Sequence, residues 1–171
     1  ISRRTACVLT GSLVLGLGGR PALAQLALAA PKDKTILTIS GKISVANKDG
    51  AAAFDLAMLE AMGLVPIETM TPWYTSKVKF EGVPMTKLLK AVGATGDKLT
   101  VSALNDYKTE IPVEDFEKFG TILALKRDGQ YMPVSDKGPL FVIYPYDSNP
   151  ELKTQKFYSR SAWQVAKIEV K

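Results

Sequence analysis

The sequence contains no histidine and only one cysteine, Cys7, among its 171 residues. Histidine and cysteine are the commonest protein ligands of transition metals, and histidine is the most frequent general base. Their scarcity excludes most metallohydrolases and most enzymes that activate a nucleophile with an imidazole. The Gly-rich loops of nucleotide and dinucleotide sites and the Gly-x-Ser-x-Gly turn of serine hydrolases are absent as well. The usual parts of an enzyme active site are therefore missing.

Carboxylates are the remaining class of metal ligand, but the sequence has no Asp-x-Asp-x-Asp loop. Its nearest grouping of acids is Glu114, Asp115 and Glu117, within a short helix predicted over residues 113–119. Such a charge pattern is typical of a solvated helix face. We therefore expect these three side chains to be exposed, and we expect no metal site.

The first 24 residues have the pattern of a secretory signal peptide. Ser2-Arg3-Arg4 precedes an uncharged stretch over residues 6–19, and Ala22-Leu23-Ala24 provides a small-x-small cleavage pattern, with Ala27-Leu28-Ala29 as a second option. The stretch is too short to span a bilayer comfortably, and its glycines disfavour a buried helix. We expect cleavage near Ala24 and export to the periplasm. The arginine pair matches the core of a twin-arginine signal, so both export routes stay open.

Charge of one sign is not concentrated anywhere in the rest of the chain. The sequence has 22 Lys and Arg against 17 Asp and Glu, a formal net charge of +5. Arg3, Arg4 and Arg20 lie in the predicted signal and no acid does, which leaves 19 basic residues and a net charge of +2. Without a basic run, nucleic acid is a poor candidate partner. No later segment reaches the length of a membrane span, so a soluble periplasmic protein is expected.

Beyond the signal, residues 25–34 predict a mobile leader, and residues 35–171 predict a single domain. Alternating β-branched and apolar residues predict a strand over 35–40 and another over 42–45, followed by a turn over 47–50.

Two helices follow from capping residues and apolar spacing. Asp55 is placed to cap a short helix that Gly63 closes. Pro84 opens a second helix that ends at Gly93, and its apolar residues fall at i, i+3, i+4 and i+7: Met85, Leu88, Leu89 and Val92.

Short apolar runs separated by turns account for most of the remaining chain. They predict strands over residues 78–82, 99–104, 108–111, 121–126, 130–132, 140–144 and 165–170. The run over 140–144 is apolar throughout and bracketed by prolines, which is typical of a fully buried strand. Many short strands with few short helices predict an α+β fold with a mostly antiparallel, barrel-like or sandwich-like core.

Three predicted loop segments combine aromatic and polar residues, and both tryptophans of the chain lie in them. Aromatic faces and amide, carboxylate or guanidinium groups are what a flat polar heterocycle needs for stacking and for hydrogen bonds along its edge. Composition alone also allows the tryptophans to be core anchors and Arg160 to be a surface ion-pair partner. The candidate binding residues are Thr71, Trp73, Tyr74, Asn105, Asp106, Tyr107, Tyr158, Ser159, Arg160, Ser161 and Trp163.

A series of short motifs in a fixed order resembles the molybdopterin-binding domain of the sulfite oxidase superfamily, and more closely its small exported pterin-binding members. The resemblance runs from about Thr35 to the C-terminus. The motifs that carry it include Thr71-Pro72-Trp73, Phe80-Glu81-Gly82-Val83-Pro84, Asn105-Asp106-Tyr107, Gly138-Pro139-Leu140, Tyr144-Pro145 and Ser159-Arg160-Ser161-x-Trp163-Gln164. It implies the sulfite-oxidase-type fold and a pterin or molybdopterin-like ligand.

The sequence departs from the superfamily's enzymes at two positions. Those enzymes hold molybdenum through a cysteine in the loop that corresponds to residues 68–73, which here reads Glu-Thr-Met-Thr-Pro-Trp. They also carry an arginine soon after the Gly-Pro-Leu motif, where this chain has Phe141. Without a thiolate, a soft ligand for molybdenum is missing.

The sequence therefore predicts a non-catalytic periplasmic protein that binds a pterin or related heterocycle without molybdenum. The resemblance implies that it presents the ligand to a membrane signalling protein that controls cyclic dinucleotide levels. A molybdopterin-dependent oxidoreductase subunit is the alternative, and a structural or glycan-binding β-domain is a third class.

Overall fold

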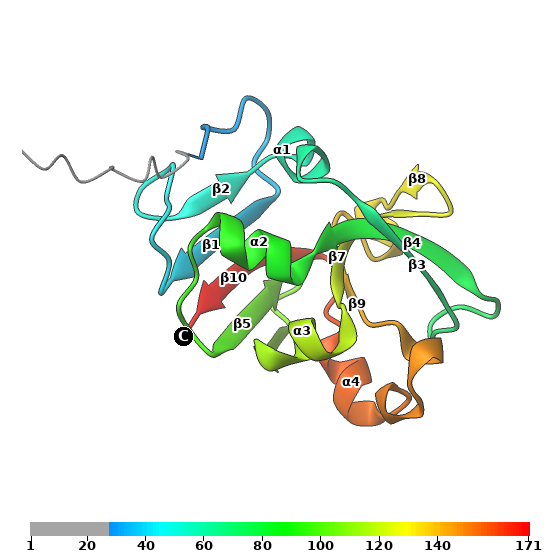
Figure 1. Cartoon of the computed structure of the whole chain (residues 1–171). Coiled ribbons are helices and arrows are strands. Elements are labelled where there is room, and N and C mark those ends of the chain that lie inside the picture. The colour runs from blue at the N-terminus through cyan, green and yellow to red at the C-terminus, as the bar shows by residue number, and fades with distance from the viewer. Residues whose placement is uncertain (1–27) are drawn as a thin grey trace, which may run out of the picture.

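A computed structural model describes residues 28–171, and the predicted signal peptide lies outside the described residues. Figure 1 shows the arrangement, in which strands dominate and the helices are short. The strands are β1 (Leu37–Gly41), β2 (Ala52–Phe54), β3 (Val65–Thr69), β4 (Val78–Pro84), β5 (Lys98–Ala103), β6 (Lys108–Pro112), β7 (Ile122–Arg127), β8 (Gln130–Tyr131), β9 (Phe141–Ile143) and β10 (Val165–Val170). The α-helices are α1 (Leu56–Ala61), α2 (Met85–Ala91), α3 (Glu114–Phe119) and α4 (Gln155–Arg160).

The strands form two five-stranded sheets. The first has the order β2-β1-β10-β5-β6, and the second has the order β3-β4-β7-β8 with β9 also paired to β7. All strand pairs are antiparallel except β1 with β10, which run parallel with Ile39 opposite Ile168. The α+β, mostly antiparallel fold predicted from the sequence is confirmed.

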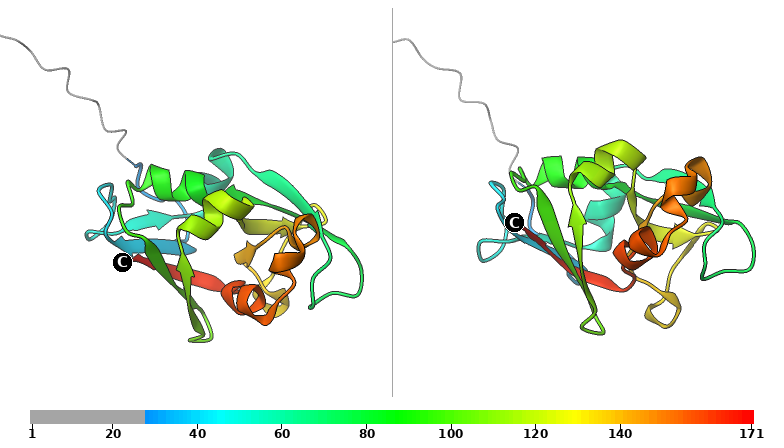
Figure 2. Two further views of the ribbon diagram at one scale, coloured as in Figure 1. Left: turned by 60° about the horizontal axis from the view of Figure 1, so that its bottom comes forward. Right: turned by 90° about the horizontal axis from the view of Figure 1, so that it is seen from below.

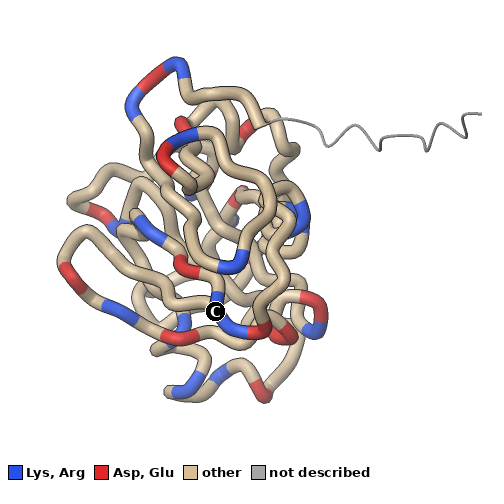
Figure 3. Tube along the Cα trace, turned by 90° about the vertical axis from the view of Figure 1, so that its left-hand side faces the viewer, with Lys and Arg blue, Asp and Glu red and all other residues tan. Residues whose placement is uncertain are grey.

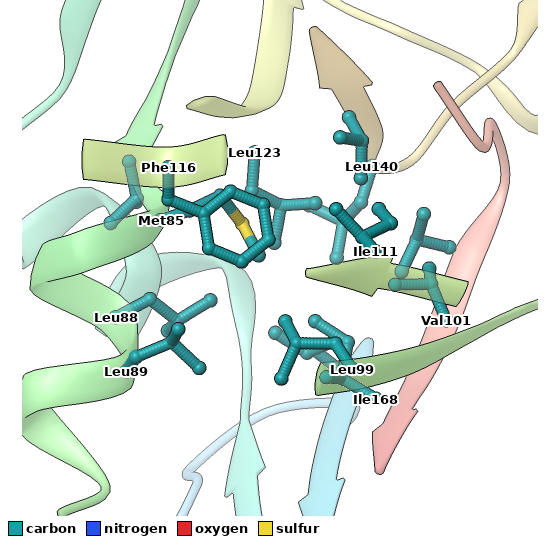
Figure 4. Close-up of a cluster of buried hydrophobic side chains, with 14 of the residues drawn as sticks. Met85, Leu88, Leu89, Leu99, Val101, Ile111, Phe116, Leu123, Leu140 and Ile168 are labelled. Carbon is teal, nitrogen blue, oxygen red and sulfur yellow. The ribbon is translucent and has the colours of Figure 1, made fainter. Parts of the chain in front are cut away.

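The core lies where α2 and α3 pack against both sheets (Figure 4). The four apolar residues of the predicted second helix are buried, and Met85, Leu88 and Val92 are fully buried. Phe116 of α3 and Leu123 of β7 contribute to the same cluster. Burying such side chains is worth about 1.5–3 kcal/mol each before the entropy of ordering is counted. The helical periodicity in the sequence therefore identified residues that contribute strongly to the core.

The strand predicted over residues 42–45 is wrong. Gly41 ends β1 with φ of +90°, and a Cβ at this position would lie 2.2 Å from the Val170 carbonyl oxygen. The chain then passes over the end of α2, where the Ser44 and Val45 amides each donate to the Val92 carbonyl at 3.1 Å. These amides satisfy a helix-terminal carbonyl that has no partner within the helix, so they are not available to a sheet.

The described residues of the predicted leader have no helix or strand, but they contact the domain. Asp55 caps α1 by accepting from the Met58 amide at 2.9 Å, as predicted. Its other carboxylate oxygen accepts from the amides of Lys32 at 2.8 Å and Asp33 at 3.1 Å. One buried carboxylate thus holds both a helix start and the segment that leads into β1.

The hydrogen bonds to Asp55 make the stability of the fold sensitive to acid. The bond from the Met58 amide, followed by that from Asp33, lowers the pKa of Asp55 from its ordinary value of 3.8. A carboxyl with a lowered pKa stabilises the folded state above its ordinary pKa and loses that contribution as pH falls through the lowered value. We expect the midpoint of thermal unfolding to fall between about pH 5 and pH 3, and to fall less steeply in Asp55→Asn.

Differential scanning calorimetry across this pH range measures the effect. Glu117→Gln is the matched control because Glu117 is exposed on α3. If the unfolding midpoint falls equally steeply with pH in wild type and in Asp55→Asn, Asp55 is not the cause of the acid sensitivity.

Charges of both signs are mixed along the described chain, as Figure 3 shows for the side that carries the C-terminus. On the first sheet, Glu110 pairs with Lys98 at 3.1 Å and with Lys171 at 3.8 Å. None of the helices in residues 28–171 is long and apolar enough to cross a membrane.

Candidate functional site

The three aromatic segments identified in the sequence meet at one pocket. They are the loop after β3, the turn between β5 and β6, and the C-terminal part of α4 with the residues that follow it. In the left-hand view of Figure 2 the β5–β6 turn and α4 both lie at the lower edge of the molecule. The pocket has a volume of about 250 Å³ and is lined by Pro72, Trp73, Tyr107, Gln155, Tyr158, Ser159, Ser161 and Trp163. Sites for drug-sized ligands are usually about 300–1,000 Å³, so this pocket suits one small ring system.

Aromatic rings form most of the wall. The Trp73 ring lies 5.9 Å from Trp163 and 6.0 Å from Tyr158 between centroids, both edge to face. It also contacts the buried rings of Phe141 at 5.2 Å and Tyr146 at 6.1 Å. Trp73 is therefore both a pocket residue and a half-buried member of the core. The sequence left a binding-site residue and a core anchor as alternatives, and Trp73 has the position of both.

Tyr107 forms the exposed side of the pocket. Its ring is parallel to Trp163, at an interplanar angle of 6° and a centroid distance of 6.5 Å. The Tyr107 hydroxyl donates to the Ser159 carbonyl at 2.7 Å. Because Tyr107 is 44% exposed, this link between the β5–β6 turn and α4 adds accessible aromatic surface rather than core.

Two predicted residues position neighbours of the pocket instead of lining it. Thr71 is buried, and its hydroxyl accepts from the Trp73 amide at 3.4 Å. The Asn105 side chain accepts from the Tyr107 amide at 3.2 Å. Each polar side chain thus fixes the backbone of the aromatic residue two positions later.

Tyr74 and Asp106 lie outside the pocket. The Tyr74 hydroxyl bonds to Asp136 at 3.1 Å, and Arg127 and Lys137 lie over its ring at 4.8 Å and 4.9 Å. Desolvation by burial raises the pKa of Tyr74 above its ordinary value. Asp106 is exposed, has a φ of +65° in the β5–β6 turn, and lines a separate depression.

Arg160 points away from the pocket and pairs with Asp115. Its Nη1 donates to Asp115 Oδ2 at 2.6 Å, and the Tyr144 hydroxyl donates to the same oxygen at 2.8 Å. The side chains of Arg160 and Asp115 are only 16% and 6% exposed. The expectation that Asp115 is exposed is therefore wrong, because the first turn of α3 directs this carboxylate toward Tyr144, which directly follows β9, and toward Arg160 of α4. The structure agrees with the interpretation of Arg160 as an ion-pair partner, but the pair is largely buried and does not lie on the surface.

Ser161 lines the pocket, but its hydroxyl is engaged in the core. It donates to the Phe157 carbonyl at 2.8 Å and forms a short hydrogen bond with the Tyr146 hydroxyl. Burial raises the pKa of Tyr146, and burial together with the Asp115 charge raises the pKa of Tyr144. Both tyrosines are thus neutral donors or acceptors that fix the wall behind the pocket.

Asp147 attaches the Trp73 loop to the segment before α4. It accepts from the Met70 amide at 2.9 Å, and its own amide donates to the Thr69 hydroxyl at 3.0 Å. The Lys153 ammonium, 2.8 Å away, is the main cause that lowers the pKa of Asp147. Sequence reasoning missed Asp147, because no local pattern indicates a partner 77 residues away. It also missed the pocket residue Gln155.

The side chains near the pocket do not suit a molybdenum centre. The resemblance implies a cysteine thiolate as the protein's own ligand to molybdenum, and the loop over residues 68–73 has none. No cluster of three or more His, Cys, Asp or Glu that could hold a metal ion occurs within residues 28–171. Phe141, at the position where the resemblance implies an arginine, is fully buried against Trp73. The aromatic wall, by contrast, fits the faces of a pterin ring.

A family model described as the oxidoreductase molybdopterin binding domain matches residues 57–147, slightly more than half of the chain. The matched range contains the Trp73 loop, the β5–β6 turn and Asp115, and it ends before α4. No curated protein matches the chain significantly.

Proposed function

The chain belongs to the oxidoreductase molybdopterin binding domain family, and from this membership we propose that it binds a pterin in the aromatic pocket without catalysing its turnover. The observation that carries the proposal is the composition of the pocket. Trp73, Tyr107, Tyr158 and Trp163 supply ring faces, while the adjoining loop supplies no thiolate.

Stacking on the aromatic wall would hold the ligand by its faces. Stacking of a base on an aromatic side chain is worth about 1–3 kcal/mol, and a nucleobase is the nearest analogue of a pterin ring. Gln155 stands at the rim and is exposed. Its carboxamide has both donors and an acceptor, which match the alternating donors and acceptors on the edge of a pterin.

The same proposal places the protein in the periplasm, where it presents the pterin to a membrane protein that controls cyclic dinucleotide levels. Its support is the signal-like N-terminal sequence and the resemblance to small exported pterin-binding proteins. The alternative function, an oxidoreductase subunit that obtains its metal in an atypical way, predicts a different cofactor content.

Analysis of the released cofactor tests the proposal. We expect protein isolated from its natural host and then denatured to release a fluorescent pterin, identified by mass, in a near-equimolar amount. Elemental analysis of the same sample should find molybdenum far below that amount. Near-equimolar molybdenum, or turnover of sulfite or a sulfoxide, would overturn the proposal in favour of the oxidoreductase subunit. A Tyr107→Ala/Trp163→Ala variant prepared in parallel is expected to release much less pterin.

A further inference from the structure

A second concave surface lies beside the pocket, on the face of the first sheet that the helices do not cover. Two depressions of about 320 Å³ and 250 Å³ share Leu104, Ala166 and Lys167 as lining residues. We name this combined surface the Leu104 groove, defined by Leu104, Val134, Asp106, Lys34, Lys108 and Lys167. The proposed pterin site uses none of these side chains.

Two apolar side chains stand exposed in the groove at a fixed separation. Leu104 is 54% exposed and Val134 is 50% exposed. Gln164 joins their backbones, because its carbonyl accepts from the Leu104 amide at 2.9 Å and its Nε2 donates to the Val134 carbonyl at 2.7 Å. In the right-hand view of Figure 2 the β5–β6 turn and the segment before β9 project from the same side. The apolar groups are therefore pre-positioned, which lowers the entropic cost of binding a partner.

The charges around these apolar groups are predominantly positive. Lys34, Lys108 and Lys167 line the groove, and Asp106 is the one carboxylate that lines it among the described residues. Lys167 and Lys108 both lie opposite Ser102 in the strand register, so they share one face of the sheet, roughly 10 Å apart. Within residues 28–171 these three lysines have no ion-pair partner, whereas Lys98 of β5 and Lys171, directly after β10, both pair with Glu110.

We propose that the Leu104 groove is the docking surface for a protein partner that brings an acidic segment with an apolar side chain. The apolar side chain would occupy the space between Leu104 and Val134, and its flanking carboxylates would meet the three lysines. Such an arrangement is complementary in shape and charge, and interfaces of this kind derive affinity from the central apolar contact and association rate from the charges at the rim. Leu104 and Val134 line a depression that a projecting side chain of a protein can fill, so a protein partner is favoured over a lipid surface.

The groove and the pocket share structural elements. Leu104 and Tyr107 belong to the same β5–β6 turn. Trp163 lines the pocket, and its neighbour Gln164 hydrogen-bonds to the backbones of Leu104 and Val134. A ligand that orders Tyr107 against Trp163 therefore orders the backbone that carries Leu104. By linkage, the ligand and the partner should strengthen each other's binding by the same factor. This coupling rests on the proposed pterin function, but the groove as a docking surface does not.

A fluorescent peptide provides the test. The probe is a short peptide with two leucines among glutamates, titrated into the purified protein and followed by fluorescence anisotropy. Control probes replace the leucines by serine or the glutamates by lysine. We expect Leu104→Ser and the double variant Lys108→Glu/Lys167→Glu each to weaken binding about tenfold or more. The double variant Lys87→Glu/Lys90→Glu on α2 makes the same change in net charge on exposed lysines elsewhere and should change binding less than about twofold.

Three results would contradict the proposal. Absence of peptide binding, or equal losses in both charge-reversal variants, would show that the groove is not a specific docking surface. Stronger binding to phosphatidylglycerol vesicles than to the peptide, with the same dependence on Leu104, would replace the protein partner by a membrane. Pterin content is measured on each sample, which keeps the two proposals apart. A protein that binds the peptide but no pterin would contradict the proposed pterin function and leave the docking surface supported.

Discussion

Asp115→Ala is expected to lower the free energy of unfolding by about 3–5 kcal/mol, which is the usual cost of removing one member of a buried ion pair. The substitution leaves the Arg160 guanidinium largely buried without its carboxylate and removes the acceptor of the Tyr144 hydroxyl. The same carboxylate joins α3, the segment after β9 and α4, so its loss also loosens the helix that forms one wall of the pocket.

Urea unfolding monitored by tryptophan fluorescence measures this effect. Asp115→Asn should be less damaging because an amide oxygen still accepts from Tyr144. Glu117→Ala, on the exposed face of the same helix, should change stability by no more than about 0.5 kcal/mol. Arg160→Ala and the double variant Asp115→Ala/Arg160→Ala complete a double-mutant cycle. Its coupling energy measures the interaction between the two side chains. A loss below about 1 kcal/mol in Asp115→Ala would mean that water replaces the carboxylate and that the pair is not structural.

Tyr107→Ala is expected to weaken pterin binding roughly ten- to a hundredfold, the equivalent of one aromatic stack. Its stability should change little because the ring is exposed and its hydroxyl makes one bond, to the Ser159 carbonyl. Trp73→Ala should lose a similar amount of affinity and, in addition, about 2 kcal/mol or more of stability. This loss of stability is expected because Trp73 packs against the buried rings of Phe141 and Tyr146.

Titration with a reduced pterin, paired with thermal unfolding of the same samples, separates the two roles. Tyr131→Ala is a suitable control, because Tyr131 is 50% exposed on β8 and does not line the pocket. Wild-type affinity in Tyr107→Ala would remove the β5–β6 turn from the site. Unchanged affinity in Trp73→Ala, together with a lower unfolding midpoint, would make Trp73 a core residue only.

Helices and strands that depend on residues close together in the sequence were predictable from it. The Pro84 start, the apolar spacing and Gly93 define α2, and the apolar run between Pro139 and Pro145 defines β9 as a buried strand. The strand β3 and the helix α4 were missed. The β3 strand is mostly exposed and contains Pro66, and α4 is six residues long without a side-chain cap. Pairing with β4 and packing against neighbouring elements determine these two segments, and no local pattern encodes such contacts.

The candidate site was predictable in its segments but not in its individual contacts. Trp73, Tyr107, Tyr158, Ser159, Ser161 and Trp163 line one pocket, as the three aromatic segments suggested. Their roles in binding a pterin stay predictions. The orientation of Arg160 was not predictable, because its partner is 45 residues away on a helix whose pattern indicated solvent exposure. Charge patterns report the average environment of a helix face, and one inward-facing carboxylate is enough to break the pattern.

The parallel pairing of β1 with β10 determines when this domain can form during synthesis. The last strand lies between β1 and β5, so the first sheet remains in two separate parts until Val165–Val170 have been translated. A nascent chain that ends before this strand exposes the facing edges of β1 and β5, and open edges of this kind recruit other strands. Assembly of the sheet is therefore a late event that joins residues far apart in the sequence, which favours slow folding. Deletion of Val165–Val170 should be more damaging to the yield of folded protein than deletion of six residues from an exposed loop.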